Sequence, residues 1–164
     1  MSNDIQTRSS GTEITVGLIA DTHGLLRPEA LKALGGVNLI IHAGDVGRED
    51  ILETLEQLAP VYAVRGNVDR GGWAKALPIS RQVVVGQLSL YVYHGHEKVA
   101  SDLAATSCRV VVSGHSHKAQ AELRDRILYL NPGSAGPRRF KLPVTLMRLH
   151  INGHDVQHEL TELV

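Results

Sequence analysis

Seven side chains of metal-binding type lie in short motifs along this 164-residue chain, and most of them follow short apolar runs. They are Asp21, His23, Asp45, Asn67, His94, His115 and His117. Carboxylate, imidazole and amide groups bind divalent metals of intermediate hardness, whereas a structural zinc ion takes only four ligands. Seven candidates are too many for one tetrahedral ion. They suit two metals that share a carboxylate, an arrangement that favours phosphoryl chemistry.

Two of the motifs place metal-binding residues two positions apart. In an extended segment such residues point the same way, so Asp21 and His23 are expected to face one metal. His115 and His117 are expected to face one site together for the same reason. Glycines beside the motifs allow tight turns and a close approach of the backbone to an ion. These glycines are Gly24, Gly44, Gly66, Gly95 and Gly114.

The elements that must position these residues are short buried strands. Apolar, β-branched runs predict strands over 14–20, 38–42 and 61–64. Helical signals predict helices over 28–34 and 48–58, between those strands. A β-α-β-α-β order is typical of a parallel sheet, and ligands bind at the carboxyl ends of its strands. The motif residues are therefore expected to converge at one edge of a sheet.

The second half of the chain is expected to be mostly β. Hairpins are predicted at Gly86-Gln87 and at Asn152-Gly153. A buried strand is predicted over 109–113, and a short helix over 98–106. The expected fold is of the α/β class, with two packed sheets flanked by helices.

Composition limits the classes of protein that this chain can be. A single domain over 13–164 is expected, preceded by a disordered tail over 1–12. The formal net charge of +0 argues against a nucleic-acid partner, and no apolar run approaches the ~20 residues that span a bilayer. The single cysteine, Cys108, excludes an intramolecular disulfide and fits a reducing, cytoplasmic location. A homo-oligomer is left open.

Five short motifs occur in a fixed order along the chain. They are Asp21-Thr22-His23, Gly44-Asp45, Gly66-Asn67, His94-Gly95 and Gly114-His115-Ser116-His117. In this order they resemble the calcineurin-like metallophosphoesterase superfamily and, within it, the small YfcE-type phosphodiesterases. The segment 131–134 also matches that subgroup. The resemblance implies a four-layer αββα sandwich of two mixed sheets. It also implies metal-dependent hydrolysis of phosphoesters, most of all phosphodiesters.

The resemblance also implies a role for each candidate ligand. It assigns Asp21, His23 and His117 to the first metal. It assigns Asn67, His94 and His115 to the second metal, with Asp45 as the bridge. The implied nucleophile is a hydroxide held between the two ions, and Asn67 helps to offset charge on the phosphoryl oxygens. Manganese is the implied metal, with iron, zinc and nickel as alternatives.

One position departs from the superfamily pattern. Many members carry a histidine directly after the Gly-Asn pair, where this chain has Val68. Valine cannot transfer a proton, although the small subgroup also commonly lacks that histidine. His96 is a candidate replacement acid, and a preference for esters with good leaving groups is expected.

Two other functions remain as alternatives. One is a phosphomonoesterase, and the other is a Vps29-like protein-interaction scaffold with little activity. The presence of all seven candidate ligands argues against the scaffold. The expected partner is a small phosphoester, selected by the loops 70–76 and 95–101. His42 and Asn131 are expected to support the motifs, while Arg138 and Arg139 either reach the site or are solvated.

Overall fold

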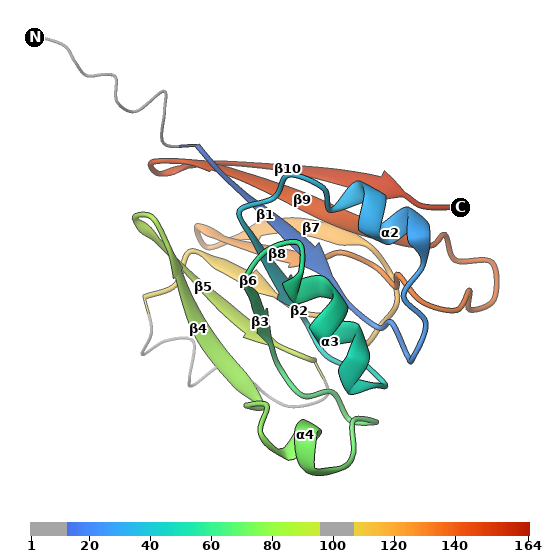
Figure 1. Cartoon of the computed structure of the whole chain (residues 1–164). Coiled ribbons are helices and arrows are strands. Elements are labelled where there is room, and N and C mark those ends of the chain that lie inside the picture. The colour runs from blue at the N-terminus through green and yellow to red at the C-terminus, as the bar shows by residue number, and fades with distance from the viewer. Residues whose placement is uncertain (1–12, 96–106) are drawn as a thin grey trace, which may run out of the picture.

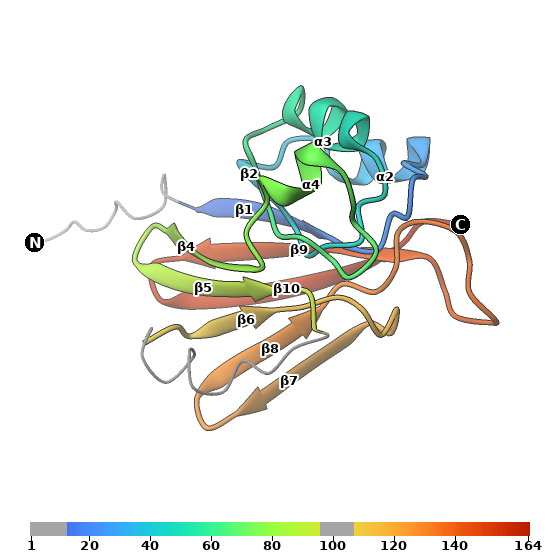
Figure 2. The same ribbon diagram turned by 90° about the horizontal axis from the view of Figure 1, so that it is seen from below.

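Two five-stranded mixed sheets lie face to face in the computed structural model, which describes residues 13–95 and 107–164 (Figures 1 and 2). The strand order is β10-β9-β1-β2-β3 in the first sheet and β4-β5-β6-β8-β7 in the second. The expected fold class, two mixed sheets flanked by helices, is confirmed. The predicted tail over 1–12, the predicted helix over 98–106 and His96 lie outside the described residues.

The first sheet contains the three strands predicted from the N-terminal apolar runs. Its strands are β1 (Ile14–Ile19), β2 (Leu39–His42), β3 (Val61–Ala63), β9 (Thr145–Asn152) and β10 (Asp155–Glu162). β1 is parallel to β2, and β2 is parallel to β3. His42 at the end of β2 is opposite both Ile19 and Ala63, so the carboxyl ends of the three strands are level. The loops that follow them therefore emerge side by side.

The second sheet brings two further motifs to an edge in the same way. Its strands are β4 (Ser80–Val85), β5 (Leu88–Tyr93), β6 (Val110–Val112), β7 (Gln120–Arg124) and β8 (Ile127–Asn131). β4 and β5 form the predicted antiparallel hairpin, whereas β5, β6 and β8 run parallel. Because β5 and β6 are parallel neighbours, the segments after Tyr93 and Val112 leave the sheet at the same edge.

The main hydrophobic core lies between the sheets. Val16 and Leu18 of β1 belong to one buried cluster with Leu90 and Val92 of β5. A second buried cluster joins the other face of the first sheet to the helices α2 (Pro28–Ala33) and α3 (Glu49–Glu56). Since both faces of β1 and β2 are covered, their sequences are continuous apolar runs rather than alternating patterns.

The helices are short, and one of them was not predicted. α4 (Gly72–Lys75) spans four residues, which is too short to produce a periodic hydrophobic pattern.

The end of α2 is held by β9, because the Arg148 guanidinium donates to the carbonyls of Ala33 (2.7 Å) and Gly35 (3.1 Å). Within 13–95 and 107–164, no helix is long and apolar enough to cross a bilayer.

Candidate metal centre

The loops after β1, β2 and β6 carry candidate ligands in an unusual backbone conformation. Five of these residues have a positive φ: Asp21 (57°), His23 (47°), Asp45 (56°), His115 (74°) and His117 (65°). Non-glycine residues rarely adopt this region, which costs about 1–2 kcal/mol per residue. Strain of this kind gathers where a site requires a particular side-chain direction. These five are the majority of the nine non-glycine residues with positive φ in the described chain.

The expectation that these motifs are extended is wrong. β1 ends at Ile19 and β6 at Val112, so the motif residues lie in turns beyond the strands. Asp21 and His23 nevertheless converge, with 3.7 Å between the Asp21 Oδ1 and His23 Nε2 atoms. His115 and His117 separate into two neighbouring groups of metal-binding side chains.

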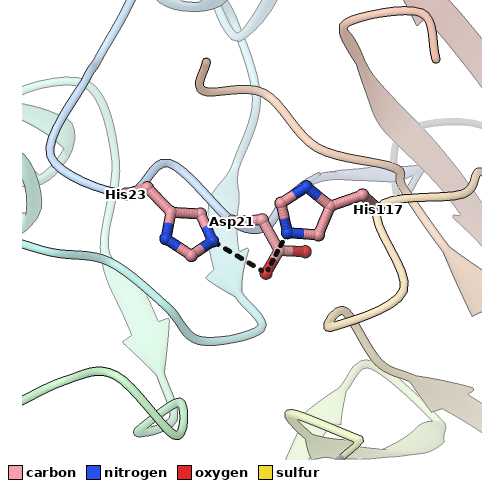
Figure 3. A group of neighbouring side chains, drawn as sticks. All are labelled: Asp21, His23 and His117. Atoms are coloured by element: carbon pink, nitrogen blue, oxygen red, sulfur yellow. Dashed lines mark ion pairs between the residues drawn. The ribbon is translucent and has the colours of Figure 1, made fainter. Parts of the chain in front are cut away.

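The first group consists of Asp21, His23 and His117 (Figure 3). The Asp21 Oδ1 atom lies between the two imidazoles, 3.7 Å from His23 Nε2 and 3.6 Å from His117 Nε2. The other oxygen of Asp21 accepts a hydrogen bond from the His115 backbone N–H at 3.0 Å. This bond fixes the orientation of the carboxylate and leaves Oδ1 directed at the histidines.

The second group consists of Asp45, His94 and His115. The Asp45 Oδ2 atom is 3.1 Å from His94 Nε2 and 3.5 Å from His23 Nε2, so this one oxygen faces both groups. The His115 Nδ1 atom lies 3.3 Å from His94 Nε2. Each group contains side chains from the loops of both sheets: Asp21 and Asp45 follow β1 and β2, while His94 and His117 follow β5 and β6.

Hydrogen bonding fixes the tautomer of His94. Its Nδ1–H donates to the Ala43 carbonyl at 2.8 Å, because a carbonyl oxygen can only accept. The Nε2 atom then faces the Asp45 carboxylate, 3.1 Å from Oδ2. A histidine that donates its other ring N–H to a backbone carbonyl is the usual arrangement for a metal ligand.

Electrostatics at Asp45 and His94 favour a bound cation. Burial alone raises the pKa of Asp45, but hydrogen bonds from His94 and the Val68 N–H outweigh it and lower the pKa to about 2. Burial tends to lower the pKa of His94, but contact with Asp45 and Ala43 raises it above its ordinary value. Both shifts favour a positive charge next to the Asp45 carboxylate.

The residues of both groups fit divalent metal ions. Among the described residues, the buried polar atoms without a hydrogen-bond partner are Asp21 Oδ1, His23 Nε2 and His117 Nδ1. All three belong to the first group, and Asp21 Oδ1 and His23 Nε2 face each other, so an ion between them would compensate for their desolvation penalty. Ligand atoms ~2.1 Å from a tetrahedral ion are roughly 3.4 Å apart. The separations of 3.6 and 3.7 Å around Asp21 are close to that value.

Asp69 organises the loops around Asp45. This buried carboxylate accepts hydrogen bonds from the N–H groups of Val46 (3.2 Å), Gly47 (2.9 Å) and Gly66 (2.8 Å). It therefore ties the loop after β2 to the loop after β3. The sequence did not identify Asp69 as a site residue, because it belongs to no ligand motif. The one feature of the sequence that could have indicated a role for Asp69 is its position in the loop that contains Asn67.

The loop after β3 also reaches Asp45 through its backbone. The Val68 N–H donates to Asp45 Oδ1 at 3.1 Å, so position 68 contributes its amide rather than its side chain. A Cβ atom on Gly66 would collide with the backbone and the carboxylate of Asp45, which explains the need for glycine there. Asn67 lies between these residues with an exposed side chain, and its role as a ligand stays a prediction.

Asn131 and the two arginines have different surroundings. The Asn131 amide donates to the Gly114 carbonyl (2.9 Å) and Ser116 Oγ (3.2 Å), and so supports the loop of His115. Arg139 lies beside His117 in the lining of a common pocket. Arg138 instead donates to the carbonyls of Leu142 and Val164, away from the candidate ligands.

His42 links the loops beneath the candidate ligands. It accepts a hydrogen bond from the Gly44 N–H at Nδ1 (3.2 Å), so its Nε2–H donates to Thr22 Oγ1 (3.0 Å). Thr22 Oγ1 in turn donates to the Val46 carbonyl at 2.8 Å. Every polar atom of this fully buried imidazole is therefore used, and burial lowers the pKa of His42 to about 4.

The lowered pKa of His42 predicts a loss of stability in acid. The unfolded chain binds a proton at His42 below pH 6.5, whereas the folded chain does so only near pH 4. Its contribution is therefore complete above pH 6.5 and is lost as the pH falls toward 4. We expect metal-free protein to lose about 2–3 kcal/mol of unfolding free energy through this residue between pH 7 and 4.5.

Urea unfolding at both pH values measures this effect. A H42N variant should be less stable at pH 7 and should show a smaller decrease in acid. The exposed residue His158 provides the control, since H158N should keep the wild-type pH dependence. An unchanged decrease in H42N would contradict the prediction.

Comparisons with known proteins identify relatives in sequence and in fold. A probable metallophosphoesterase of Methanothermobacter thermautotrophicus is 37% identical in an alignment 158 positions long that covers 88% of this chain and 90% of that protein. A phosphodiesterase of Methanocaldococcus jannaschii is 29% identical in an alignment 137 positions long that covers 72% of this chain and 82% of that protein. The structure of vacuolar protein sorting 29 from Cryptosporidium parvum shares the fold, with a TM-score of 0.82, 21% identity and 93% of each chain covered.

The family profile extends over nearly the whole described chain. The Calcineurin-like phosphoesterase superfamily domain matches residues 14–154, which include every motif of the candidate centre. This superfamily uses divalent metals, in accord with the two groups of metal-binding side chains. The resemblance inferred from the motifs is thus confirmed, and the chain belongs to the calcineurin-like phosphoesterase superfamily.

Proposed function

We propose that this chain hydrolyses phosphoesters, with phosphodiesters as its preferred substrates, at a two-metal centre. The observation that carries the proposal is the position of Asp45 Oδ2, 3.1 Å from His94 and 3.5 Å from His23. A carboxylate that faces two ligand groups is what a bridging ligand requires. The similarity to a Methanocaldococcus jannaschii phosphodiesterase supports diesters as substrates.

Seven residues would hold the metals in this proposal. Asp21, His23 and His117 would bind one ion, Asn67, His94 and His115 the other, and Asp45 both. When bound, two divalent ions, with manganese favoured over iron, zinc and nickel, supply Lewis acidity toward the phosphoryl oxygens and activate a bridging water as the nucleophile. The mixed nitrogen and oxygen donors suit these metals better than calcium.

The residues of the chain prepare the centre before substrate arrives. The low pKa of Asp45, about 2, keeps its carboxylate ionised at neutral pH. The Ala43 carbonyl fixes the ring of His94, and the His115 N–H fixes the carboxylate of Asp21. Such preorganisation avoids reorientation of dipoles during the reaction. The Asn67 amide would donate to a phosphoryl oxygen, and His96 remains the candidate acid for the leaving group.

Metal analysis combined with turnover tests the proposal. Protein stripped of metal and reloaded with manganese is expected to bind about two ions per chain and to hydrolyse bis(p-nitrophenyl) phosphate faster than p-nitrophenyl phosphate. Faster turnover of the monoester would instead favour a phosphomonoesterase. Two bound ions without hydrolysis of either ester would favour a scaffold related to Vps29.

A further inference from the structure

A pocket of about 650 Å³ opens directly beside the candidate metal centre. It is lined by the segments 115–118 and 139–142. His115 and His117 belong to the two ligand groups, so the pocket is continuous with the centre. Its charged lining consists of Lys118, Arg139 and Lys141, and no carboxylate of the described residues contributes to it. The pocket is therefore suited to an anion.

The segment 139–142 is a turn held by specific hydrogen bonds. The Leu142 N–H donates to the Arg139 carbonyl at 3.0 Å, which closes the turn. The Arg138 guanidinium fastens the turn by donating to the carbonyls of Leu142 (3.1 Å) and Val164 (3.3 Å). The wall of the pocket is thus connected to the C-terminal end of the described chain.

Phe140 projects from this turn into solvent. It is the only phenylalanine in the sequence, and 90% of it is exposed, more than any other large apolar residue described. Its φ of 53° places it in the left-handed region, which is unfavourable for a bulky residue. The folded chain gains little from burial of this ring. A ligand that covers the ring would provide the missing contact.

We propose that Lys118, Arg139, Phe140 and Lys141 form a subsite for an aromatic group carried by the phosphoester substrate. The Phe140 ring stacks on the aromatic group, as aromatic side chains do with nucleobases, and the three cations attract its phosphate. This inference rests on the proposed function. It assigns substrate selection to the turn 139–142 rather than to the loops 70–76 and 95–101.

Two inert phosphonates of similar size test the stacking. Phenylphosphonate and cyclohexylphosphonate differ mainly in aromaticity, and their binding to manganese-loaded protein can be measured by calorimetry and as competition with bis(p-nitrophenyl) phosphate. We expect wild-type protein to bind phenylphosphonate about 5- to 30-fold more tightly than the cyclohexyl compound. The F140L variant, which keeps an apolar side chain, should lose this preference, and F140Y should retain it.

Further variants separate the contributions of ring and charge. K118Q and R139Q should each weaken the binding of both phosphonates about 2- to 5-fold without changing their ratio. L123A alters another exposed apolar residue, on β7, and should leave both affinities unchanged. Thymidine 5′-phosphate identifies the source of the aromatic group. If wild-type protein binds thymidine 5′-phosphate more tightly than phenylphosphonate, and F140L does not, the aromatic group belongs to a nucleoside ester. If wild-type protein binds thymidine 5′-phosphate more weakly than phenylphosphonate, the aromatic group belongs to a simple aryl ester.

Two results would overturn the subsite: equal affinity of wild-type protein for the two phosphonates, or a preference that persists in F140L. Failure of the proposed function is a separate outcome. Manganese-loaded protein that hydrolyses no phosphoester would refute hydrolysis, while the calorimetric comparison would still decide whether Phe140 selects an aromatic group.

Discussion

Replacement of Asp45 by asparagine is expected to lower both metal affinity and phosphoester turnover by more than about 100-fold. Loss of a residue that merely orients a ligand already costs 10–100-fold, and Asp45 would itself be a ligand to both ions. In the variant, a neutral amide group would face His23 and His94 in place of the ionised carboxylate. The measurements are metal content per chain and kcat/KM for bis(p-nitrophenyl) phosphate.

The geometry makes D45N a conservative test of this role. Asparagine tolerates the left-handed conformation of position 45, where φ is 56°. Its amide oxygen can still accept the hydrogen bond from the Val68 N–H. D155N, on the exposed start of β10, is the matched control and should behave as wild type. Wild-type metal content and turnover in D45N would disprove the bridging role.

Replacement of Asp69 by alanine is expected to lower the free energy of unfolding by about 3–5 kcal/mol. The substitution removes the acceptor for three backbone N–H groups, of Val46, Gly47 and Gly66, at least two of which are buried. Each buried donor left without a partner costs about 1–3 kcal/mol. Because these groups hold the loop of Asp45, catalytic activity should also decrease even under conditions in which the variant is folded.

Urea unfolding in excess chelator isolates this effect, since bound metal would otherwise add to the measured stability. D69N retains one acceptor oxygen and should lose less stability than D69A. D50A is the control, because the Asp50 side chain is exposed and pairs with Arg48 on the surface. Its loss should not exceed about 1 kcal/mol. A loss in D69A as small as that in D50A would contradict the organising role of Asp69.

Elements with strong local signals were predictable from the sequence. β1 is predicted by its continuous apolar run, and the hairpin turn at Asn152-Gly153 is predicted by its residue types. The position of the motifs at strand ends predicted that the candidates lie close together, because parallel strands bring their carboxyl ends to one edge of a sheet. Six of the seven candidates do lie in the two neighbouring groups.

The local geometry of the site was not predictable in the same way. Spacing suggested an extended backbone at 21–23, whereas Asp21 and His23 adopt a left-handed conformation, with backbone hydrogen bonds to the loop after β2. The contribution of Asp69 depends on contacts with residues about twenty positions away, which no local pattern records. The exposure of Phe140 likewise depends on the turn that Arg138 fastens.

Both groups of metal-binding residues contain side chains from the loops of both sheets. Metal binding would therefore be thermodynamically linked to the docking of the two sheets. An ion that binds only when the sheets are docked acts as a removable crosslink between them. At a free metal concentration 100 times the dissociation constant, one such ion adds about 2.7 kcal/mol to the stability of the docked state. Removal of the metal would therefore lower the stability of the docked sheets.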